Sequence, residues 1–554
     1  MKELVLLGDE ALALGALHAG VSGCYGYPGT PSTEILEYLV DEFETRGGPV
    51  ARWCANEKTA YESALGVSFA GKRSIVTMKH VGLNVAADPF MNSSLCQIKG
   101  GLICVVADDP SMHSSQGEQD TRYYADFAMV PLFEPVNQQE AYEMVAEAFE
   151  LSERLAVPVI MRMVTRLAHS RAVVHVADTA RAQNALEKGS PADWMLLPAL
   201  ARKNYAKMLD KQTTLREWAN DYPRNTLALN PARKDLAIVT SGLGKNYLAE
   251  NMAEYAELCG KEGLPSILHV AALPFPADLI RSLAEKVETI LVIEEGMPFL
   301  ERQLAGILPG RVKVIGKLTG SLPRTGELNP ELVRAALGLP ARATALDGFK
   351  MPSLSARPPQ LCKGCPHHDS YSALNLAVER LNAKEGKVST VVAADIGCYA
   401  LGAVAPLKAI ETIVCMGASI GMARGAADAG YKYAFGVIGD STFLHSGLTG
   451  IVDAVASKTP MTVIILDNSI VAMTGCQPTM LPSNQLEKAV IGLGVDPAHL
   501  RVIEAKPNMI EQNAAGFMEE AEHRGLSVII MVRECLEAHR LRKKKESAAG
   551  EASK

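Results

Sequence analysis

Short apolar runs rich in β-branched residues alternate with helix-length amphipathic stretches along most of the chain. Residues 4–7, 74–78, 102–107 and 158–161 are four such runs in its N-terminal third. Each run has the length of a strand, and the stretches between runs are long enough for a crossover helix. The alternation therefore predicts parallel sheets covered by helices, which is the α/β fold class.

This alternation recurs in three parts of the chain, whose 554 residues are too many for one hydrophobic core. Pro352, Pro358 and Pro359 disfavour helix and sheet between the second and third parts, which predicts a linker there. The expected divisions are an α/β domain at residues 1–180, a helical connector at 181–232, a second α/β domain at 233–346, the linker at 347–360, a third α/β domain at 361–537 and a charged tail at 538–554.

Charge and hydropathy exclude several classes of protein. The formal net charge of −7 argues against a nucleic-acid binder. A basic run at residues 540–545 is the exception, and we interpret it as a solvated tail or as a docking point for an acidic electron carrier. No signal peptide opens the chain and no apolar run reaches about 20 residues, so we expect a cytoplasmic protein without a membrane span.

The most specific motif lies in the third α/β region, where an apolar run ends in Gly439-Asp440-Ser441. A further 26 residues separate it from Asn468-Ser469, which ends the next apolar run. Gly-Asp and Asp-Asn alone are ordinary turn signals at strand ends. Their joint spacing resembles the motif by which thiamine diphosphate enzymes bind magnesium and the diphosphate, although Ser469 replaces the second Asn of the usual pair.

Magnesium explains why oxygen donors stand at these two positions, because this hard ion prefers octahedral oxygen coordination. Asp440 and Asn468 would supply a carboxylate and an amide oxygen. The resemblance adds the carbonyl of Ile470 as a third protein ligand, and it places the turn at Gly439 and Ser441 against the diphosphate.

Thiamine diphosphate enzymes also need a carboxylate that hydrogen-bonds the aminopyrimidine ring and promotes loss of the thiazolium C2 proton. The segment from Arg52 to Glu57 resembles the segment that carries this glutamate, and a helix rich in small residues follows it. Glu57 is therefore the expected catalytic acid, and Glu62 is the alternative one turn later. The competing interpretation is that Glu57 only favours the helix dipole in the first turn.

Further segments resemble the 2-oxoacid:ferredoxin oxidoreductases, and in particular their indolepyruvate branch. The loop Tyr25-Gly-Tyr-Pro-Gly-Thr30-Pro-Ser-Thr33 resembles one in which the first threonine contacts the substrate carboxylate, which is Thr30 here. Lys79-His80-Val-Gly-Leu-Asn84 and Met112-His-Ser-Ser-Gln116 also match this branch. The resemblance implies three domains of the thiamine-diphosphate-binding and transketolase C-terminal-like types.

Substrate recognition departs from this resemblance at one point. Pyruvate-type relatives have an arginine after the run at residues 102–107, whereas this chain has Asp108-Asp109-Pro110. The partner of the substrate carboxylate is therefore open. His80 is a candidate, although a lone histidine is as often structural.

Eleven cysteines in a large chain that is expected to be cytoplasmic predict thiol chemistry or metal ligation rather than disulfides. Cys362-Lys-Gly-Cys365 alone fits zinc, redox chemistry or half of an iron–sulfur site. It resembles the cysteine pair that opens the thiamine domain in this superfamily, where Cys398 and Cys535 occupy the places of the third and fourth cluster ligands. We expect one [4Fe–4S] cluster, and zinc or unligated thiols are the alternatives. The other seven cysteines, including Cys476, are interpreted as packing residues.

The expected function is oxidative decarboxylation of an aryl 2-oxoacid, such as indolepyruvate, to its acyl-CoA. Large subunits of this branch continue into a ferredoxin-like domain, whereas this sequence stops after a charged tail, so we expect those clusters on another polypeptide. The expected partners are a small gamma- or beta-type subunit and a ferredoxin or ferredoxin-like subunit, in a dimer of heterodimers. The alternatives are a non-oxidative decarboxylase or carboligase, and a catalytically silent scaffold.

Overall fold

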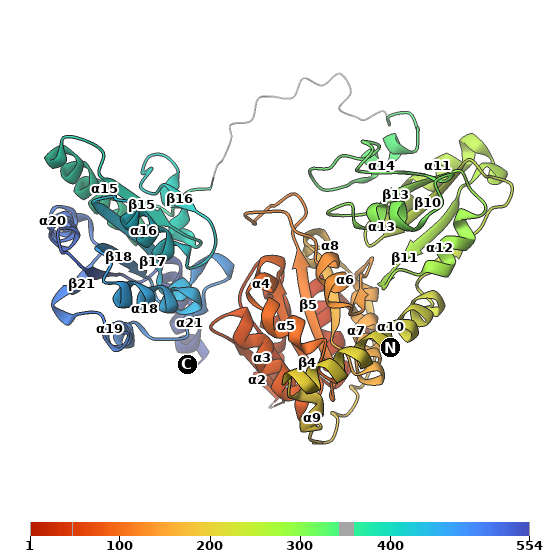
Figure 1. Cartoon of the computed structure of the whole chain (residues 1–554), viewed down its shortest axis with the longest axis horizontal. Helices are drawn as coiled ribbons and strands as arrows, with labels where there is room; N and C mark the ends of the chain where they lie inside the picture. Colours follow the sequence, from red (N-terminus) through yellow and green to blue (C-terminus); the bar gives the residue numbers. More distant parts are fainter. Residues whose placement is uncertain (1, 47, 343–358, 553–554) are drawn as a thin grey trace. The chain divides into compact units, whose positions relative to one another are not determined.

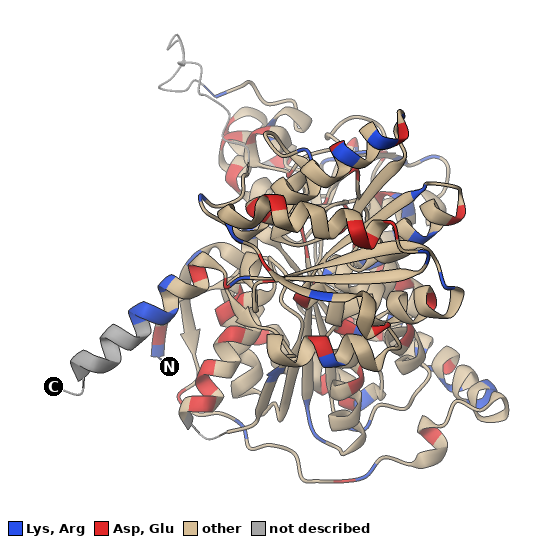
Figure 2. Cartoon of the chain, turned by 90° about the vertical axis from the view of Figure 1, so that its left-hand side faces the viewer, with Lys and Arg blue, Asp and Glu red and all other residues tan. Residues whose placement is uncertain are grey.

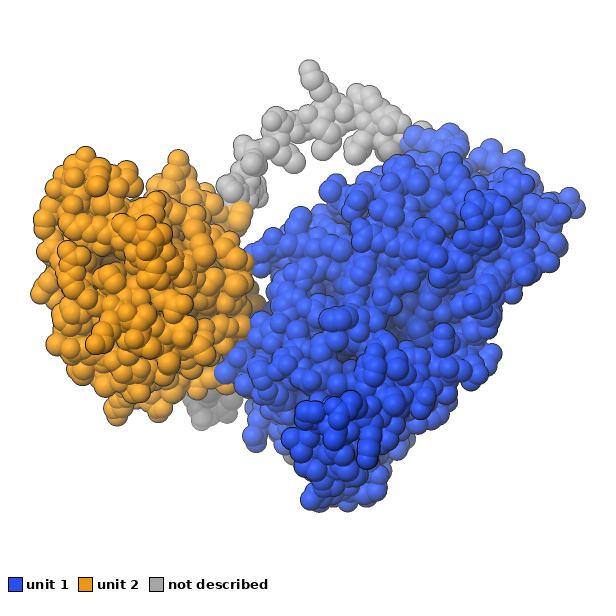
Figure 3. Space-filling view, in the orientation of Figure 1, with its two compact units in different colours: residues 1–349 blue, residues 350–554 orange. Residues whose placement is uncertain are grey.

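The computed structural model describes residues 2–46, 48–342 and 359–552. The chain divides into two compact units, residues 1–349 and 350–554, which have different colours in Figure 3. Residues 347–358 of the expected linker, residues 343–346 at the end of the expected second domain, and the last two residues of the tail lie outside the described residues.

A seven-stranded sheet forms the core of the first unit, in the order β12-β6-β7-β5-β4-β2-β3. Figure 1 labels β4 and β5 of this sheet. Its strands are parallel except for β12, which pairs antiparallel with β6. β4 and β5 are buried along their whole length because helices cover both faces. The strands are β2 (Gly23–Gly26), β3 (Val50–Trp53), β4 (Ser74–Lys79), β5 (Leu102–Asp108), β6 (Leu132–Phe133), β7 (Val159–Val164) and β12 (Ala272–Leu273).

The two faces of this sheet carry different helices. The first face packs against α1 (Gly8–His18), α2 (Thr33–Arg46), α7 (Gln138–Leu155) and α8 (Thr165–His169). The second face packs against α3 (Glu57–Phe69), α4 (His80–Val85), α5 (Ala87–Ser93) and α6 (Arg122–Ala128). Alternate residues of β4 and β5 face the two clusters, since side chains along a strand point to opposite faces in turn.

The prediction that residues 4–7 belong to the parallel sheet is wrong. They lie in β1 (Lys2–Leu7), which pairs antiparallel with β8 (Arg171–Val176) in a separate two-stranded sheet. Val5 is 63% exposed and Leu6 only 7%, so one face of this strand meets solvent, as antiparallel ribbons allow. An apolar run of four residues does not reveal which neighbour its backbone will pair with.

A second sheet of the first unit has five strands in the order β14-β13-β10-β11-β9, all parallel except β9. The region expected to be a helical connector contains α9, the long helix α10 and also β9, which joins this sheet. The elements are α9 (Pro191–Trp194), α10 (Pro198–Asp221), β9 (Thr226–Ala228), β10 (Leu236–Ser241), α11 (Gly244–Cys259), β11 (Ser266–Val270), α12 (Ala277–Ala284), β13 (Thr289–Ile293), α13 (Phe299–Ile307), β14 (Lys313–Ile315) and α14 (Pro330–Ala336).

Two fully buried arginines connect the seven-stranded and the five-stranded sheets of the first unit. Arg162 on β7 donates to Asp108 at 2.6 Å and also pairs with Glu134. Arg122 pairs with Asp120 and, at 2.7 Å, with Glu294 directly after β13. Burial acts to raise the pKa of Asp120, but the guanidinium groups of Arg122 and Arg162 outweigh this effect and lower the pKa. Removing one member of such a network leaves a buried charge without its partner, which makes the network a strong constraint on how the sheets pack.

Replacing Arg162 with methionine is expected to destabilise the first unit by about 3–5 kcal/mol, because Asp108 and Glu134 would stay buried without a cation. Chemical denaturation followed by tryptophan fluorescence measures this, since all three tryptophans lie in the first unit. Arg166→Met is the matched control, because its partly exposed pair with Glu327 is worth at most about 1 kcal/mol. Equal losses for both variants would contradict the account.

The second unit is built on a parallel six-stranded sheet in the order β16-β15-β17-β18-β22-β21. Helices α15 and α20 cover one face, and α16, α18 and α19 cover the other. The elements are α15 (Pro366–Glu385), β15 (Thr390–Ala394), β16 (Thr412–Ile413), α16 (Ala418–Asp428), β17 (Tyr433–Gly439), α17 (Asp440–Thr442), α18 (Leu448–Ser457), β18 (Met461–Asp467), β19 (Ile470–Val471), β20 (Gln477–Pro478), α19 (Ser483–Gly492), β21 (Leu500–Glu504), α20 (Ile510–Ala521), β22 (Leu526–Val532) and α21 (Leu536–Ala552).

Most of the expected charged tail is helical, because residues 538–552 belong to α21. Its basic residues Arg540, Arg542, Lys543 and Lys544 are exposed. Figure 2 shows Lys and Arg in blue on this helix, which leads to the C-terminus. Among the described helices, none is long and apolar enough to cross a membrane.

Candidate active site

Asp440 and Asn468 come together at the carboxyl edge of the sheet in the second unit. Asp440 opens α17 directly after β17, and Asn468 follows β18, the neighbouring parallel strand. The backbone N–H of Ser469 donates to Asp440 Oδ2 at 2.9 Å, which ties the two loops together. The backbone N–H of Ile470 donates to Asn468 Oδ1 at 3.1 Å. The structure therefore gathers the predicted magnesium ligands in one place.

The orientation of the Asn468 amide is fixed by a buried histidine. Burial lowers the pKa of His367 to about 4, so its ring is neutral near pH 7. Asn468 Nδ2 lies 3.2 Å from His367 Nε2, which accepts a hydrogen bond from it. The amide nitrogen is thereby occupied, and the amide oxygen is the end that remains for a cation.

A second carboxylate, Asp467, lies beside Asp440 and was missed by the sequence analysis. Burial raises the pKa of Asp440, and the neighbouring Asp467 raises it further. Within the described residues, Asp467 Oδ2 and Ser441 Oγ are buried without hydrogen-bond partners. A hard divalent cation would satisfy these oxygens together, so the residues present fit magnesium. The available signal was that Asp467 directly precedes Asn468 at a strand end.

Gly439 is required by close packing at this edge. A Cβ atom at this position would lie 2.6 Å from the ring of Tyr399. The hydroxyl of Tyr399 donates to Asp395, whose Oδ2 accepts from the backbone N–H of Ser419 at 3.2 Å in the first turn of α16. The glycine thus lets β17 end close to the neighbouring loop after β15.

The four predicted cluster cysteines also gather in the second unit. Burial, together with the nearby thiols of Cys365, Cys535 and Cys362, raises the pKa of the Cys398 thiol to about 12. The backbone N–H of Cys535 donates to the Asn468 carbonyl at 3.3 Å, so this cysteine adjoins the predicted magnesium loop. Cys476, interpreted above as a packing residue, also acts on the pKa of Cys398.

In the first unit, Glu57 begins α3 and is 6% exposed. Asn56 caps the helix by accepting from the Thr59 backbone N–H at 2.9 Å. A Cβ atom on Gly82 would lie 2.6 Å from Glu57 Oε1, so α4 passes directly over this carboxylate. Glu62, the alternative, is 45% exposed and pairs with Lys58. These surroundings favour Glu57 as the functional acid.

His80 opens the same helix α4 and is 2% exposed. Its Nε2 lies 3.1 Å from the Gly117 carbonyl, while its Nδ1 is buried without a hydrogen-bond partner. His80 and Glu57 therefore share one region of the first unit, because α4 contributes both His80 and the glycine that packs on Glu57.

Lys79, which the sequence analysis left without a role, lies beside the Thr30 loop. Its Nζ donates to the Ser114 carbonyl at 2.7 Å and to Ser114 Oγ at 3.1 Å, and Ser114 Oγ donates to the Thr30 carbonyl at 3.3 Å. Burial lowers the pKa of Lys79 to about 8, against the opposing effect of Asp109. The signal in the sequence was a lysine directly after the apolar run at residues 74–78, where a strand was expected.

Two known protein families match this chain, one in each unit. Residues 14–204 match the family described as pyruvate flavodoxin/ferredoxin oxidoreductase, thiamine diP-bdg. Residues 395–529 match the thiamine pyrophosphate enzyme, C-terminal TPP binding domain.

Whole-length relatives decide the family. Indolepyruvate oxidoreductase subunit IorA of Methanothermobacter thermautotrophicus is 36% identical, over 96% of this chain and 87% of that protein. This chain belongs to the IorA family. The subunit of the same name from Archaeoglobus fulgidus is also 36% identical, over 86% of this chain and 76% of that protein. The chain is thus a thiamine-diphosphate-dependent subunit of a 2-oxoacid:ferredoxin oxidoreductase.

Among solved structures, the similarity to the 2-oxoglutarate:ferredoxin oxidoreductase from Magnetococcus marinus covers 60% of this chain and 65% of that chain, with 16% sequence identity and a TM-score of 0.48. With that score the IorA assignment rests on the sequence relatives and the matched families.

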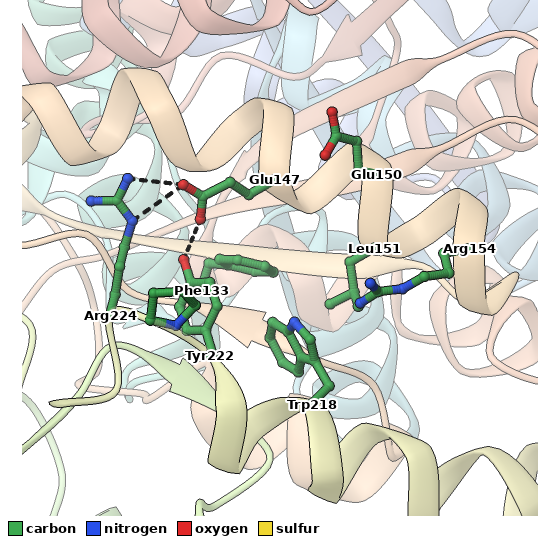
Figure 4. Close-up of a pocket in the computed structure, with 9 residues that line it drawn as sticks. Phe133, Glu147, Glu150, Leu151, Arg154, Trp218, Tyr222 and Arg224 are labelled. Atoms are coloured by element: carbon green, nitrogen blue, oxygen red, sulfur yellow. Dashed lines mark hydrogen bonds and ion pairs between the residues drawn. The ribbon is translucent and has the colours of Figure 1, made fainter. Parts of the chain in front are cut away.

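A separate pocket of about 470 Å³ lies between α7 and the end of α10 in this IorA-family chain (Figure 4). Phe133, Leu151 and Trp218 give it an apolar wall. Glu147 accepts hydrogen bonds from the Tyr222 hydroxyl and, at 2.8 Å, from Arg224. None of the predicted site residues lines this pocket, so it has no part in the site described above.

Replacing Cys398 with serine is expected to remove most of the iron and sulfide from anaerobically purified protein, because one of the four predicted cluster ligands would be lost. Iron and sulfide analysis with the visible absorption spectrum measures this. Cys259→Ser is the matched control and should keep the wild-type content, since Cys259 is an exposed residue of the first unit. Unchanged iron in the Cys398 variant would contradict the assignment.

Proposed function

We propose that this chain catalyses CoA-dependent oxidative decarboxylation of an aryl 2-oxoacid, of the indolepyruvate kind, to acyl-CoA. Electrons would leave through a [4Fe–4S] cluster on Cys362, Cys365, Cys398 and Cys535 to a ferredoxin. The observation that supports the proposal is the hydrogen bond from the Cys535 backbone N–H to the Asn468 carbonyl, because it joins a predicted cluster ligand to a predicted magnesium ligand. A decarboxylase without redox chemistry has no need of a one-electron acceptor there.

The second unit would hold the charged end of the cofactor. Asp440, Asn468 and the Ile470 carbonyl would bind Mg²⁺, with Gly439 and Ser441 in the turn beside the diphosphate. The bound cofactor supplies the electron sink that decarboxylation of a 2-oxoacid requires. His367 keeps the Asn468 oxygen available, and Asp467 adds negative charge that favours retention of the cation.

The first unit would supply the acid. Glu57 is nine-tenths buried at the start of α3, where it would hydrogen-bond the aminopyrimidine ring nitrogen and hold a proton there. Gly82 leaves room for this carboxylate, since any larger residue would collide with it.

The substrate would be held by its carboxylate near the Thr30 loop. Lys79 provides a positive charge that forms no ion pair with a carboxylate among the described residues, and Thr30 and His80 supply polar atoms nearby. Asp108 and Asp109, which replace the arginine of pyruvate-type relatives, are occupied by Arg162 and by Ser114, Ser115 and Thr165. Lys79 is therefore the better candidate for the missing cation than His80.

The relatives' names describe a subunit, so the active assembly would contain partners. We assign these as a small gamma- or beta-type subunit and a ferredoxin or ferredoxin-like electron acceptor, in a dimer of heterodimers. The substrates of the assembly would be the 2-oxoacid and CoA.

Replacing Glu57 with glutamine is expected to lower substrate-dependent carrier reduction by roughly 100-fold or more, because the amide cannot hold the catalytic proton. The assay is anaerobic reduction of ferredoxin or viologen by the assembled complex with 2-oxoacid and CoA. Glu62→Gln is the matched control and should retain wild-type turnover. Full turnover of the Glu57 variant would favour a scaffold, and aldehyde release without carrier reduction would favour a non-oxidative decarboxylase.

Replacing Lys79 with glutamine is expected to raise KM for the 2-oxoacid by roughly 10- to 100-fold, the equivalent of one charged hydrogen bond of about 1.5–3 kcal/mol. KM for CoA should change little. Lys58→Gln removes an exposed lysine and serves as the control. An unchanged KM for the 2-oxoacid would remove Lys79 from substrate binding.

A further inference from the structure

Three side chains outside the site described above converge in the first unit. One ligand atom each from Asp9, Glu34 and His169 lies within 4.8 Å of the other two. They come from α1, α2 and α8, and these helices follow β1, β2 and β7 along the chain. Ligand sites of parallel α/β sheets gather beyond the carboxyl ends of the strands, which is where α2 and α8 begin.

Asp9 is the unusual member of the group. It is completely buried, and neither of its carboxylate oxygens has a hydrogen-bond partner among the residues that the structure describes. Glu34 Oε2 is also buried and unpartnered. Burial raises the pKa of Asp9, and the adjacent Glu34 and Glu10 raise it further. A buried carboxylate with no donor and a second carboxylate beside it needs a positive partner.

The backbone holds these three residues in place without a ligand. Gly8 N–H donates to the Ser170 carbonyl at 3.2 Å, and a Cβ atom on Gly8 would lie 2.2 Å from the Leu167 carbonyl oxygen. Only glycine therefore allows the start of α1 to lie so close to α8. At the start of α2, Thr33 Oγ1 accepts from the Gly29 N–H at 3.0 Å, which positions the turn that carries Glu34.

The group is reachable from solvent on one side. The side chains of Glu34 and His169 are 36% and 34% exposed, and His169 Nε2 lies 3.5 Å from Glu34 Oε1. Asp9 forms the closed end of the site, while Glu34 and His169 form its entrance. An ion could enter here without opening the core.

We propose that Asp9, Glu34 and His169 bind a divalent transition-metal ion of the Mn²⁺ or Zn²⁺ class, separate from the magnesium of the cofactor site. Two carboxylates and one imidazole suit such ions, whereas Mg²⁺ prefers an all-oxygen shell. The ion would cancel the charge on both carboxylates and satisfy the unpartnered oxygens of Asp9. A proton shared between Asp9 and Glu34 is the competing explanation.

Binding here would bear on the loop next to Lys79. Helix α8 begins at Thr165, whose Oγ1 donates to Asp109 Oδ1 at 2.8 Å. Asp109 also accepts from the Ser114 N–H at 2.8 Å, and Ser114 is the residue that Lys79 contacts. An ion held by His169 at the other end of α8 would therefore brace this loop from outside the active site.

The test is a Mn²⁺ titration of the full-length, chelator-treated chain in a large excess of Mg²⁺, followed by the electron paramagnetic resonance signal of free Mn²⁺. Mg²⁺ occupies the cofactor site, and Mn²⁺ avoids the thiolates that would capture Zn²⁺. Wild type should bind one Mn²⁺ more than Asp9→Asn and His169→Gln. Each variant should weaken this site by at least about 10-fold.

Glu10→Gln is the matched control, because Glu10 neighbours Asp9 and its carboxylate is used by the Leu7 N–H at 2.8 Å. It should bind Mn²⁺ like wild type. Asp9→Asn should melt no earlier than wild type without the ion, and Mn²⁺ should raise the melting temperature of wild type only. His169 lies near the surface, so His169→Gln stays informative if the Asp9 variant folds poorly. Equal Mn²⁺ binding by wild type and both variants would overturn the proposal and assign the proton as the partner of Asp9.

Discussion

The structure depends most on the requirement that a buried carboxylate must have a positive partner. Asp440 lies beside Asp467 at the carboxyl ends of two neighbouring parallel strands, where burial and mutual repulsion both disfavour two negative charges. The parallel strands β17 and β18 end side by side, so the fold itself brings these groups together. A divalent cation bound with a diphosphate would resolve this conflict, and the site would thereby gain affinity for the proposed cofactor.

The first unit satisfies the same requirement in a different way. Arg122 and Arg162 neutralise the acidic residues between the two sheets, and this network is completely buried. It leaves Lys79 as a cation beside the Thr30 loop, with hydrogen bonds to Ser114 but no ion pair in the described part of the chain. The distribution of paired and unpaired charge thus separates residues that hold the fold from residues available to a substrate.

The sequence was sufficient where function depends on short, local patterns. The turn at Gly439-Asp440, the place of Asn468 and the position of Glu57 at a helix start could all be predicted, because strand ends and helix caps leave local signals. The Arg122 and Arg162 network and the group of Asp9, Glu34 and His169 could not. Their partners are far apart in the chain, and nothing in the local sequence specifies that they meet. The prediction for β1 was wrong for the same reason, since its partner strand β8 is distant in the sequence.

The central claim is that Glu57 and the pair Asp440 and Asn468 serve a single thiamine diphosphate. A cryo-EM structure of the assembled oxidoreductase with thiamine diphosphate and Mg²⁺ tests it most directly. The account predicts the ion on Asp440 and Asn468, and the Glu57 carboxylate within hydrogen-bond distance of the pyrimidine ring of that cofactor. A cofactor bound elsewhere, or a Glu57 far from the pyrimidine in every pairing of protomers, would contradict it.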